Sequence, residues 1–136
     1  MIYALDSNIV SYMLKEDADV ISHYREAFDD GGDFVIPPIV FYEIQRGLLA
    51  KNLKKRLVKF STLCQKIRQV DFNNLVWQKA AQIYALLSQQ GKPIDDADIF
   101  IAAFCLVNGY TLVTNNVRHF EHIDGLKLVN WKHSKN

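Results

Sequence analysis

The sequence predicts an α/β fold: a three-layer sandwich with a mostly parallel sheet of four or five strands and helices on both faces. Short apolar runs that suit buried strands alternate along the chain with longer segments of helical periodicity. Right-handed crossovers between parallel strands then place helices on both sides of the sheet. With 136 residues, 49% of them hydrophobic, the chain suits one domain with its own core, and we expect residues 1–136 to form it.

The first elements follow in order from the N-terminus. Residues 2–5 form a short apolar run that ends at an acid, which is typical of a buried strand. Ser7 can cap a helix that extends to about Leu14, and a second helix is expected over about 20–28. The apolar run at 34–36 predicts the second strand.

The middle of the chain predicts two helices and a strand. Two prolines end the second strand and can also open a helix over about 39–50. Apolar residues then recur at spacings of four and three over 53–67, which predicts an amphipathic helix with its basic residues on the other faces. A third strand, centred near Val70, is expected within 67–72.

Two more helices and two more strands complete the order. Apolar residues at helical spacing predict a helix over about 76–87. Three acids ahead of an apolar stretch open another helix over about 95–107, where carboxylates complement the helix dipole. A fourth strand is expected at 110–113 and a fifth at 126–129.

Composition excludes several classes of protein. With 23% charged and 49% hydrophobic residues, the chain is not intrinsically disordered. No stretch approaches the ~20 apolar residues of a membrane span, and the N-terminus lacks the pattern of a signal peptide, so we expect a cytoplasmic protein with no membrane partner. Cys64 and Cys105 form no CxxC motif and are expected to be buried thiols.

Four polar positions share a place relative to the predicted strands. Asp6 follows the first strand, Glu43 lies on the helix after the second, Asp98 lies in the first turn of the helix before the fourth, and Asn116 follows the fourth. The carboxyl ends of parallel strands meet at one edge of the sheet, where ligand sites form. We therefore expect these side chains to converge.

Each of these residues also has a structural explanation, as a helix cap, a solvated helix residue or a turn residue. Their conjunction favours a site. If three ionised carboxylates lay ~5 Å apart, each pair would cost ~3 kcal/mol at an effective dielectric of ~20. Such a cluster must take up a proton or bind a cation, and oxygen ligands alone favour Mg²⁺ or Mn²⁺ over zinc.

These residues stand in motifs that resemble the PIN domain, most closely that of the VapC toxins of type II toxin–antitoxin pairs. The resemblance covers the whole chain and rests on the order and spacing of four motifs. They are Leu-Asp-Ser-Asn at 5–8, Glu43 after Pro-Pro-Ile-Val-Phe-Tyr, Asp-Ile-Phe-Ile-Ala-Ala at 98–103, and Thr-Asn-Asn-Val-Arg-His-Phe at 114–120. The closing Gly-Leu-Lys-Leu-Val-Asn-Trp at 125–131 belongs to it as well.

The resemblance implies a PIN-like sandwich and a Mg²⁺-dependent endoribonuclease, in which Mn²⁺ can replace Mg²⁺. Asp6, Glu43 and Asp98 fall on the family's acidic triad, which holds the metal, and Asn116 falls on its fourth position, which is Asp or Asn. Asp96 is a candidate auxiliary ligand that ranks below Asp98. Supporting roles fall to two residues that follow the first acid, Ser7 and Asn8.

Charge is unevenly distributed, although the net charge is only +1. Residues 46–68 hold eight of the 16 basic residues and no acid. This stretch is the candidate RNA-contacting surface, with Lys51, Lys55 and Lys59 expected to line one helical stripe and Arg46 nearby. The alternative is an outer face that only confers solubility.

The resemblance further implies a VapB-type antitoxin on the same helices, a homodimer, and transfer RNA or another structured RNA as substrate.

Other functions remain open at this point. A PIN-like module that binds RNA or metal without cutting is the main alternative. A phosphatase of the haloacid dehalogenase type also places an Asp after its first strand, but it needs a second acid two residues on, where this chain has Asn8. A receiver-like module and a flap nuclease fit less well, because the sequence shows neither the receiver's Lys nor the length of a flap nuclease.

Overall fold

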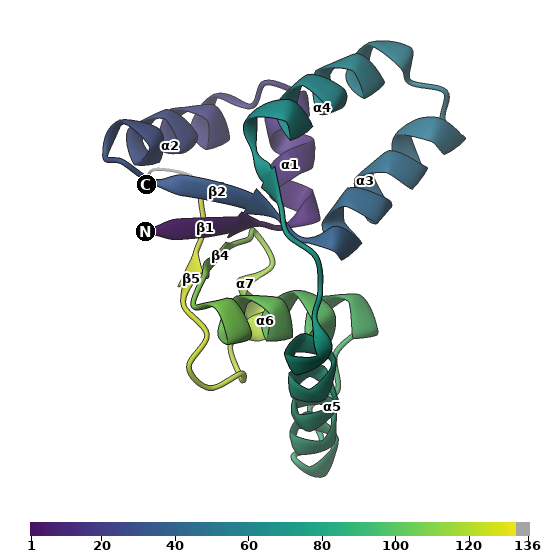
Figure 1. Cartoon of the computed structure of the whole chain (residues 1–136), viewed down its shortest axis with the longest axis vertical. Coiled ribbons are helices and arrows are strands. Elements are labelled where there is room, and N and C mark those ends of the chain that lie inside the picture. The colour runs from purple at the N-terminus through teal and green to yellow at the C-terminus, as the bar shows by residue number, and fades with distance from the viewer. Residues whose placement is uncertain (133–136) are drawn as a thin grey trace.

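A parallel five-stranded sheet forms the centre of the protein, as seen in the computed structural model, which describes residues 1–132 (Figure 1). Its strand order is β3-β2-β1-β4-β5. The strands are β1 (Ile2–Leu5), β2 (Asp33–Ile36), β3 (Arg68–Gln69), β4 (Thr111–Val113) and β5 (Leu128–Val129). The predicted fold class is confirmed, and every strand pair is parallel.

Helices lie on both sides of this sheet. In Figure 1, four helices gather on one side: α1 (Ser7–Leu14), α2 (Ala18–Asp29), α3 (Pro38–Ala50) and α4 (Lys54–Lys66). On the other side are α5 (Asn74–Gln89) and α6 (Asp96–Asn108), with the short α7 (Val117–Phe120) after β4. The chain thus adds strands in one direction from β1 to β3 and then returns to the other side of β1 to form β4.

The core lies between the sheet and these two layers. The sheet contributes Leu5, Val35 and Ile36, which are fully buried. Helix α6 packs against α5, and its residues from Ile101 to Cys105 are buried. This helix is therefore apolar around most of its circumference. Gly109 then ends α6 in the left-handed conformation, with φ +72°, which glycine adopts without steric cost.

The structure corrects several details of the predicted elements. The third strand is Arg68–Gln69 and not centred near Val70, because only Arg68 and Gln69 pair with Val35 and Ile36 of β2. Asp6, not Ser7, is the N-cap of α1, since the Asp6 carboxylate accepts a hydrogen bond from the Ser7 N–H at 2.8 Å. Helix α7 was not predicted, because four residues are too short for a periodic signal.

No helix within residues 1–132 has both the length and the apolar character needed to cross a membrane. Cys105 is buried as expected, while Cys64 is only half-buried. Burial raises the pKa of both thiols, which keeps them protonated and unreactive.

Replacing Gly47 by Ala should stabilise the protein by about 0.5–1 kcal/mol, the helix-propensity difference between the two residues. Gly47 lies inside α3, and a Cβ there would meet no atom within 4 Å. Urea unfolding measures the change. Gly109→Ala is the matched control: its added methyl also meets nothing, but the left-handed backbone disfavours Ala, so stability should fall. Equal effects of the two changes would contradict the prediction.

Candidate active site

The candidate site lies where the strand order reverses. Strands β1 and β4 are neighbours, yet the chain leaves β1 for one side of the sheet and enters β4 from the other. Loops that follow two such strands diverge and leave a crevice at their carboxyl ends. Asp6 stands directly at this point, and its backbone N–H donates to the carbonyl of Val113, the last residue of β4, at 3.0 Å.

Asp6 is a buried carboxylate held by three donors. Only 4% of the residue is exposed. Its Oδ2 accepts hydrogen bonds from Thr114 Oγ1 at 2.7 Å and from Asn8 Nδ2 at 3.3 Å, while Oδ1 accepts from the Ser7 N–H. These contacts fix the position and orientation of the carboxylate relative to both β1 and β4.

Thr114 connects the two loops and is fully buried. Besides donating to Asp6, its hydroxyl oxygen accepts from the Asn116 N–H at 3.0 Å and from Asn8 Nδ2 at 3.5 Å. Asn8 Oδ1 in turn accepts from the Asn115 N–H at 3.0 Å. The start of α1 and the loop after β4 therefore form one hydrogen-bonded unit around Asp6.

Glu43 reaches the same region from α3. It is half-buried, and its Oε1 accepts a hydrogen bond of 2.7 Å from the Ser7 hydroxyl. The helix begins at Pro38, directly after β2, and this short distance along the chain brings its second turn to the sheet edge. Ser7, the residue that follows Asp6, thus ties Glu43 to the start of α1.

Asp98 enters from the first turn of α6, on the other side of the sheet. Its side chain is 17% exposed, and His119 Nδ1 from α7 lies 3.0 Å from its Oδ2. His119 did not stand out in the sequence as a site residue, because its contact with Asp98 depends on the unpredicted helix α7.

Burial and neighbouring charge disfavour the ionised forms of Asp6 and Asp98. Burial raises the pKa of Asp6 above its usual value, and the charge of Glu43 raises it further, although the three hydrogen bonds to the carboxylate oppose this. Burial also raises the pKa of Asp98, with a further contribution from Asp6, against the opposing contact of His119. A bound cation would relieve both the repulsion and the cost of burial, so the donor set fits a hard metal ion.

The carboxylates are close enough to interact but do not form a finished cage. Within residues 1–132, no three acidic, histidine or cysteine side chains lie together in positions that could hold a metal ion. Glu43 is instead engaged by Ser7 and Asp98 by His119. Within residues 1–132, these side chains therefore do not form the tight cluster expected from the sequence.

Two other predicted residues lie apart from this group. The Asn116 side chain is exposed and does not cap α7; its backbone N–H, not its amide, joins the network through Thr114. Asp96 is the first residue of α6 and is exposed. The roles of these two side chains as ligands stay predictions.

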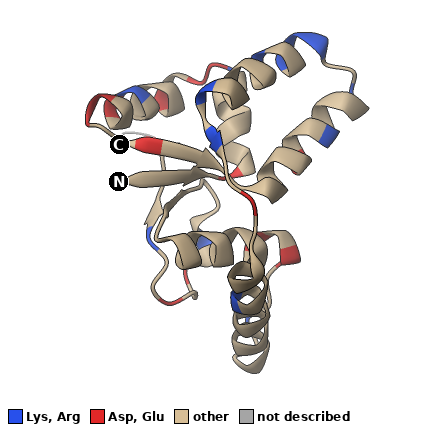
Figure 2. Cartoon of the chain, viewed as in Figure 1, with Lys and Arg blue, Asp and Glu red and all other residues tan. Residues whose placement is uncertain are grey.

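The predicted stripe of three lysines is wrong in its geometry. Lys51 is the C-cap of α3, and Asn52 then takes a positive φ of 54°, so Lys51 does not lie on the helix that carries Lys55 and Lys59. Lys59 is paired with Glu16 at 3.5 Å. Arg46 lies over the ring of Tyr42, with its guanidinium carbon 5.0 Å from the ring centre. Figure 2 shows that basic residues nevertheless gather along α3 and α4.

Sequence reasoning missed Thr114, whose hydroxyl contacts Asp6, Asn8 and the Asn116 N–H. Its signal was the position alone: a threonine directly after a buried strand and ahead of two turn-forming asparagines.

Thr114→Val should destabilise the protein by about 1–3 kcal/mol, because it removes a buried donor to Asp6 and leaves the Asn116 N–H without its acceptor. Thermal and urea unfolding measure the loss. Thr114→Ser is the control that keeps the hydroxyl, and it should retain most of the stability. Wild-type stability in Thr114→Val would mean that the network adds little.

Asp98→Asn should stabilise the protein in the absence of divalent metal at pH 7, by at most about 1 kcal/mol because the group is partly solvated. A raised pKa means that the folded state holds the proton more tightly than the unfolded state does. Ionised Asp98 therefore lowers stability as pH rises from near 3.8 through its raised pKa. The gain should vanish at lower pH, where Asp98 is protonated in both states.

Melting temperatures of both proteins across this pH range, in EDTA, test the prediction. Asp96→Asn, in the same helical turn but exposed, controls for the helix dipole and should give no such gain. A pH-independent difference for Asp98→Asn would exclude the ionisation of Asp98 as the cause.

Comparison with known protein families gives a consistent result. The family model of the PIN domain matches residues 3–126. The chain is 30% identical over 132 residues to Ribonuclease VapC2 of Rickettsia felis, covering 96% of this chain and 98% of that protein. It is 28% identical over 131 residues to the tRNA(fMet)-specific endonuclease VapC of Shigella flexneri, covering 95% and 97% of the two chains.

Solved structures with the same fold include toxin–antitoxin complexes. The chain superposes on VapBC2 from Rickettsia felis bound to a DNA fragment from their promoter, with a TM-score of 0.88 and 28% identity, over 97% of this chain and 100% of the other. For FitAcB from Neisseria gonorrhoeae the TM-score is 0.82 and the identity 27%, over 98% and 100%.

Proposed function

This chain belongs to the PIN-domain family, in its VapC branch, and from that membership we propose that it is the endoribonuclease toxin of a toxin–antitoxin pair, neutralised by a VapB-type antitoxin. The observation that supports the proposal is that Asp6, Glu43 and Asp98 approach the switch point of the sheet from three different elements. There the charge of Glu43 raises the pKa of Asp6, and the charge of Asp6 raises the pKa of Asp98. Its relatives match it along nearly their whole length.

Nucleases of the VapC type depend on a divalent metal ion. We propose Mg²⁺, with Mn²⁺ able to replace it, because the available ligands are carboxylate oxygens. Asp6, Glu43 and Asp98 would hold the ion, with Asp96 as a candidate further ligand. When bound, such an ion lowers the pKa of a water molecule and offsets charge that develops on the phosphate.

The chain's own residues set the positions for this chemistry. Asp6 is fixed by Thr114 and Asn8, so the carboxylate keeps its orientation without metal. Ser7 holds Glu43, and His119 holds Asp98; both contacts keep the two acids at the edge of the crevice. We propose that the exposed Asn116 side chain contacts the substrate or the ion, directly or through water.

The contacts of Asn8 argue against a phosphatase of the haloacid dehalogenase type. Its amide contacts Asp6, Thr114 and the Asn115 N–H, so it acts as a structural link between two loops. An amide also has no acidic proton to give to a leaving group.

We propose that the substrate is transfer RNA or another structured RNA. The relative from Shigella flexneri is named a tRNA(fMet)-specific endonuclease, which supports this proposal. Cleavage is expected to leave 5′ phosphate and 3′ hydroxyl ends. A cytoplasmic location, a homodimer and the extent of the domain as 1–136 stay predictions. The RNA-contacting roles of Arg46, Lys51, Lys55 and Lys59 also stay predictions.

Asp6→Asn, Asp98→Asn and Glu43→Gln should each lower RNA cleavage by at least about 100-fold while the protein stays folded. Each change removes a charge at nearly constant shape, so weaker metal binding dominates. Asn116→Ala should have a milder effect, because a neutral amide contributes less to a cation. Cleavage of total bacterial tRNA in Mg²⁺, with circular dichroism as the folding check, measures these effects.

Asp96→Asn is the matched control, since it removes one charge from the same helical turn. Near-wild-type cleavage by Asp98→Asn together with loss in Asp96→Asn would exchange the roles of these two acids. Undiminished cleavage by the wild type in excess EDTA would exclude the metal mechanism, and binding without any cleavage in Mg²⁺ or Mn²⁺ would identify a non-catalytic module.

Mg²⁺ should raise the melting temperature of the wild type more at pH 8 than at pH 5. Protons compete with the ion for Asp6 and Asp98, whose raised pKa values extend that competition above the usual Asp range. Melting with and without 5–10 mM MgCl₂, on the order of typical assay concentrations, gives the shift at each pH. An equal shift in Asp6→Asn would show that the ion binds elsewhere.

A further inference from the structure

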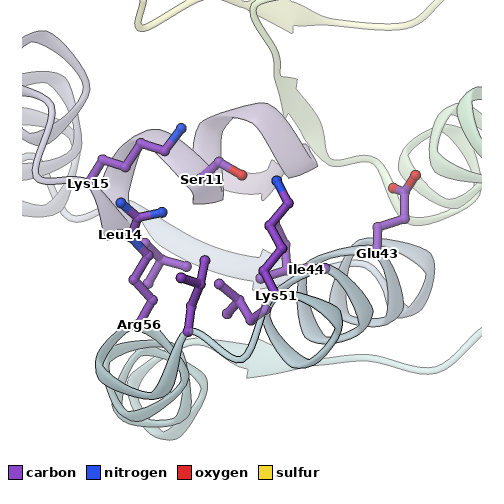
Figure 3. A pocket seen from close by; sticks show the side chains of 10 residues that line it. Ser11, Leu14, Lys15, Glu43, Ile44, Lys51 and Arg56 are labelled. Carbon is purple, nitrogen blue, oxygen red and sulfur yellow. The ribbon is translucent and has the colours of Figure 1, made fainter.

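A basic pocket adjoins the candidate active site and shares Glu43 with it. The pocket has a volume of about 170 Å³ and lies between α1, α3 and α4. Its wall carries three cations, Lys15 from the end of α1, Lys51 from the end of α3, and Arg56 from the first turn of α4. Figure 3 shows Lys15, Ser11 and Lys51 extending over the same opening, with Glu43 at its far side.

Acids within residues 1–132 do not neutralise these three cations. Within residues 1–132, none of them forms an ion pair with a carboxylate, and Arg56 is nevertheless half-buried. A guanidinium withdrawn from water without a counter-charge is unfavourable, and three cations around one opening repel one another. The pocket therefore favours an anion.

Acids close to the pocket are engaged elsewhere. Glu16 and Asp17 follow Lys15 directly in the chain, but Glu16 pairs with Lys59 at 3.5 Å and Asp17 with Lys132 at 2.8 Å. Glu43, the one acid in the pocket wall, accepts its hydrogen bond from Ser7 on the side of Asp6. Over residues 1–132, the fold leaves these three positive charges uncompensated although acids were available next to them.

We propose that Lys15, Lys51 and Arg56 form a subsite for a backbone phosphate of the RNA, next to the phosphate that is cut. Ser11 in the same wall adds a hydroxyl donor. The inference rests on the proposed ribonuclease function, because it is the shared wall at Glu43 that makes an RNA strand in the crevice continuous with the pocket. An acidic segment of a protein partner on the same helices is the alternative occupant, which the test below distinguishes from RNA.

This subsite also explains a division of charge in the crevice. The acids around Asp6 disfavour any phosphate unless a cation is present, so they contribute no attraction for the rest of the strand. A separate basic pocket beside them supplies it. Arg56 can present a planar fork to two phosphate oxygens, whereas the two lysines act as point charges.

The test compares RNA binding by two triple variants of equal charge change, both in the cleavage-deficient Asp98→Asn background. One is Lys15→Gln, Lys51→Gln, Arg56→Gln. The control is Lys79→Gln, Lys92→Gln, Lys127→Gln, none of which lines this pocket. The probe is end-labelled total bacterial tRNA, titrated from about 50 to 200 mM KCl, a range chosen because phosphate contacts weaken steeply across it.

The pocket variant should bind about tenfold more weakly at ~100 mM KCl, and its salt slope should fall by about 0.7–0.9, because one phosphate is no longer neutralised. The control should keep the parent slope. In the wild-type background, the pocket variant should raise KM for tRNA cleavage and leave kcat nearly unchanged, since the subsite binds substrate and transition state alike.

Lys15→Gln with Lys51→Gln, which leaves Arg56 in place, keeps the test valid if the triple variant folds poorly, because both lysines are exposed. It should change binding and the salt slope in the same direction but by less, because Arg56 can still contact the phosphate. A slope equal to that of the control, while the wild type still cleaves tRNA, overturns the subsite alone and points to an acidic protein segment as the occupant. Failure of the wild type to bind or cleave tRNA overturns both the subsite and the proposed function.

Discussion

The hydrogen bond from Thr114 to Asp6 is the contact on which the site depends. It joins the ends of two strands that are neighbours in the sheet but 108 residues apart in sequence. Because Asp6 is also the N-cap of α1, one carboxylate fixes the helix start, the loop after β4 and the edge of the crevice. An acid in this position costs desolvation, and the surrounding donors offset part of that cost.

This arrangement also explains why the remaining acids approach Asp6 from different layers. Glu43 arrives on α3, from the side of the sheet that carries α1 to α4, while Asp98 arrives on α6 from the opposite side. The three acids can approach one another only because the strand order reverses between β1 and β4. The topology of the sheet therefore determines where the site lies.

Much of the fold was predictable because it rests on local patterns. The strand at 2–5 and the helix around 39–50 follow from apolar runs and proline placement, and both appear within one or two residues of the expected bounds. The third strand was misplaced because its two exposed residues pair only at the sheet edge, which leaves no apolar alternation to detect. Helix α7 is set by its neighbours and not by its own sequence.

Site residues were predictable to the extent that topology alone places them. Asp6, Glu43 and Asp98 follow from their position after or before strands, and the family resemblance selected the same three. Thr114 and His119 could not be found this way, because their importance lies in partners contributed by other elements.

The lysine stripe failed for a related reason, and its failure has a functional consequence. The turn at 51–53, in which Asn52 takes a positive φ, breaks the helical register that the spacing of Lys51 and Lys55 assumed. If α3 and α4 were one continuous helix, Lys51 and Arg56 would lie five residues apart on it and about 140° apart around its axis. The turn at 51–53 instead folds α4 back beside α3 and α1, so that cations from three helix ends face one opening beside Glu43. The turn that makes the predicted lysine stripe wrong therefore also forms the basic pocket. Anion binding here depends on the tertiary fold, and the number of lysines in 46–68 is a poor guide to which of them contact RNA.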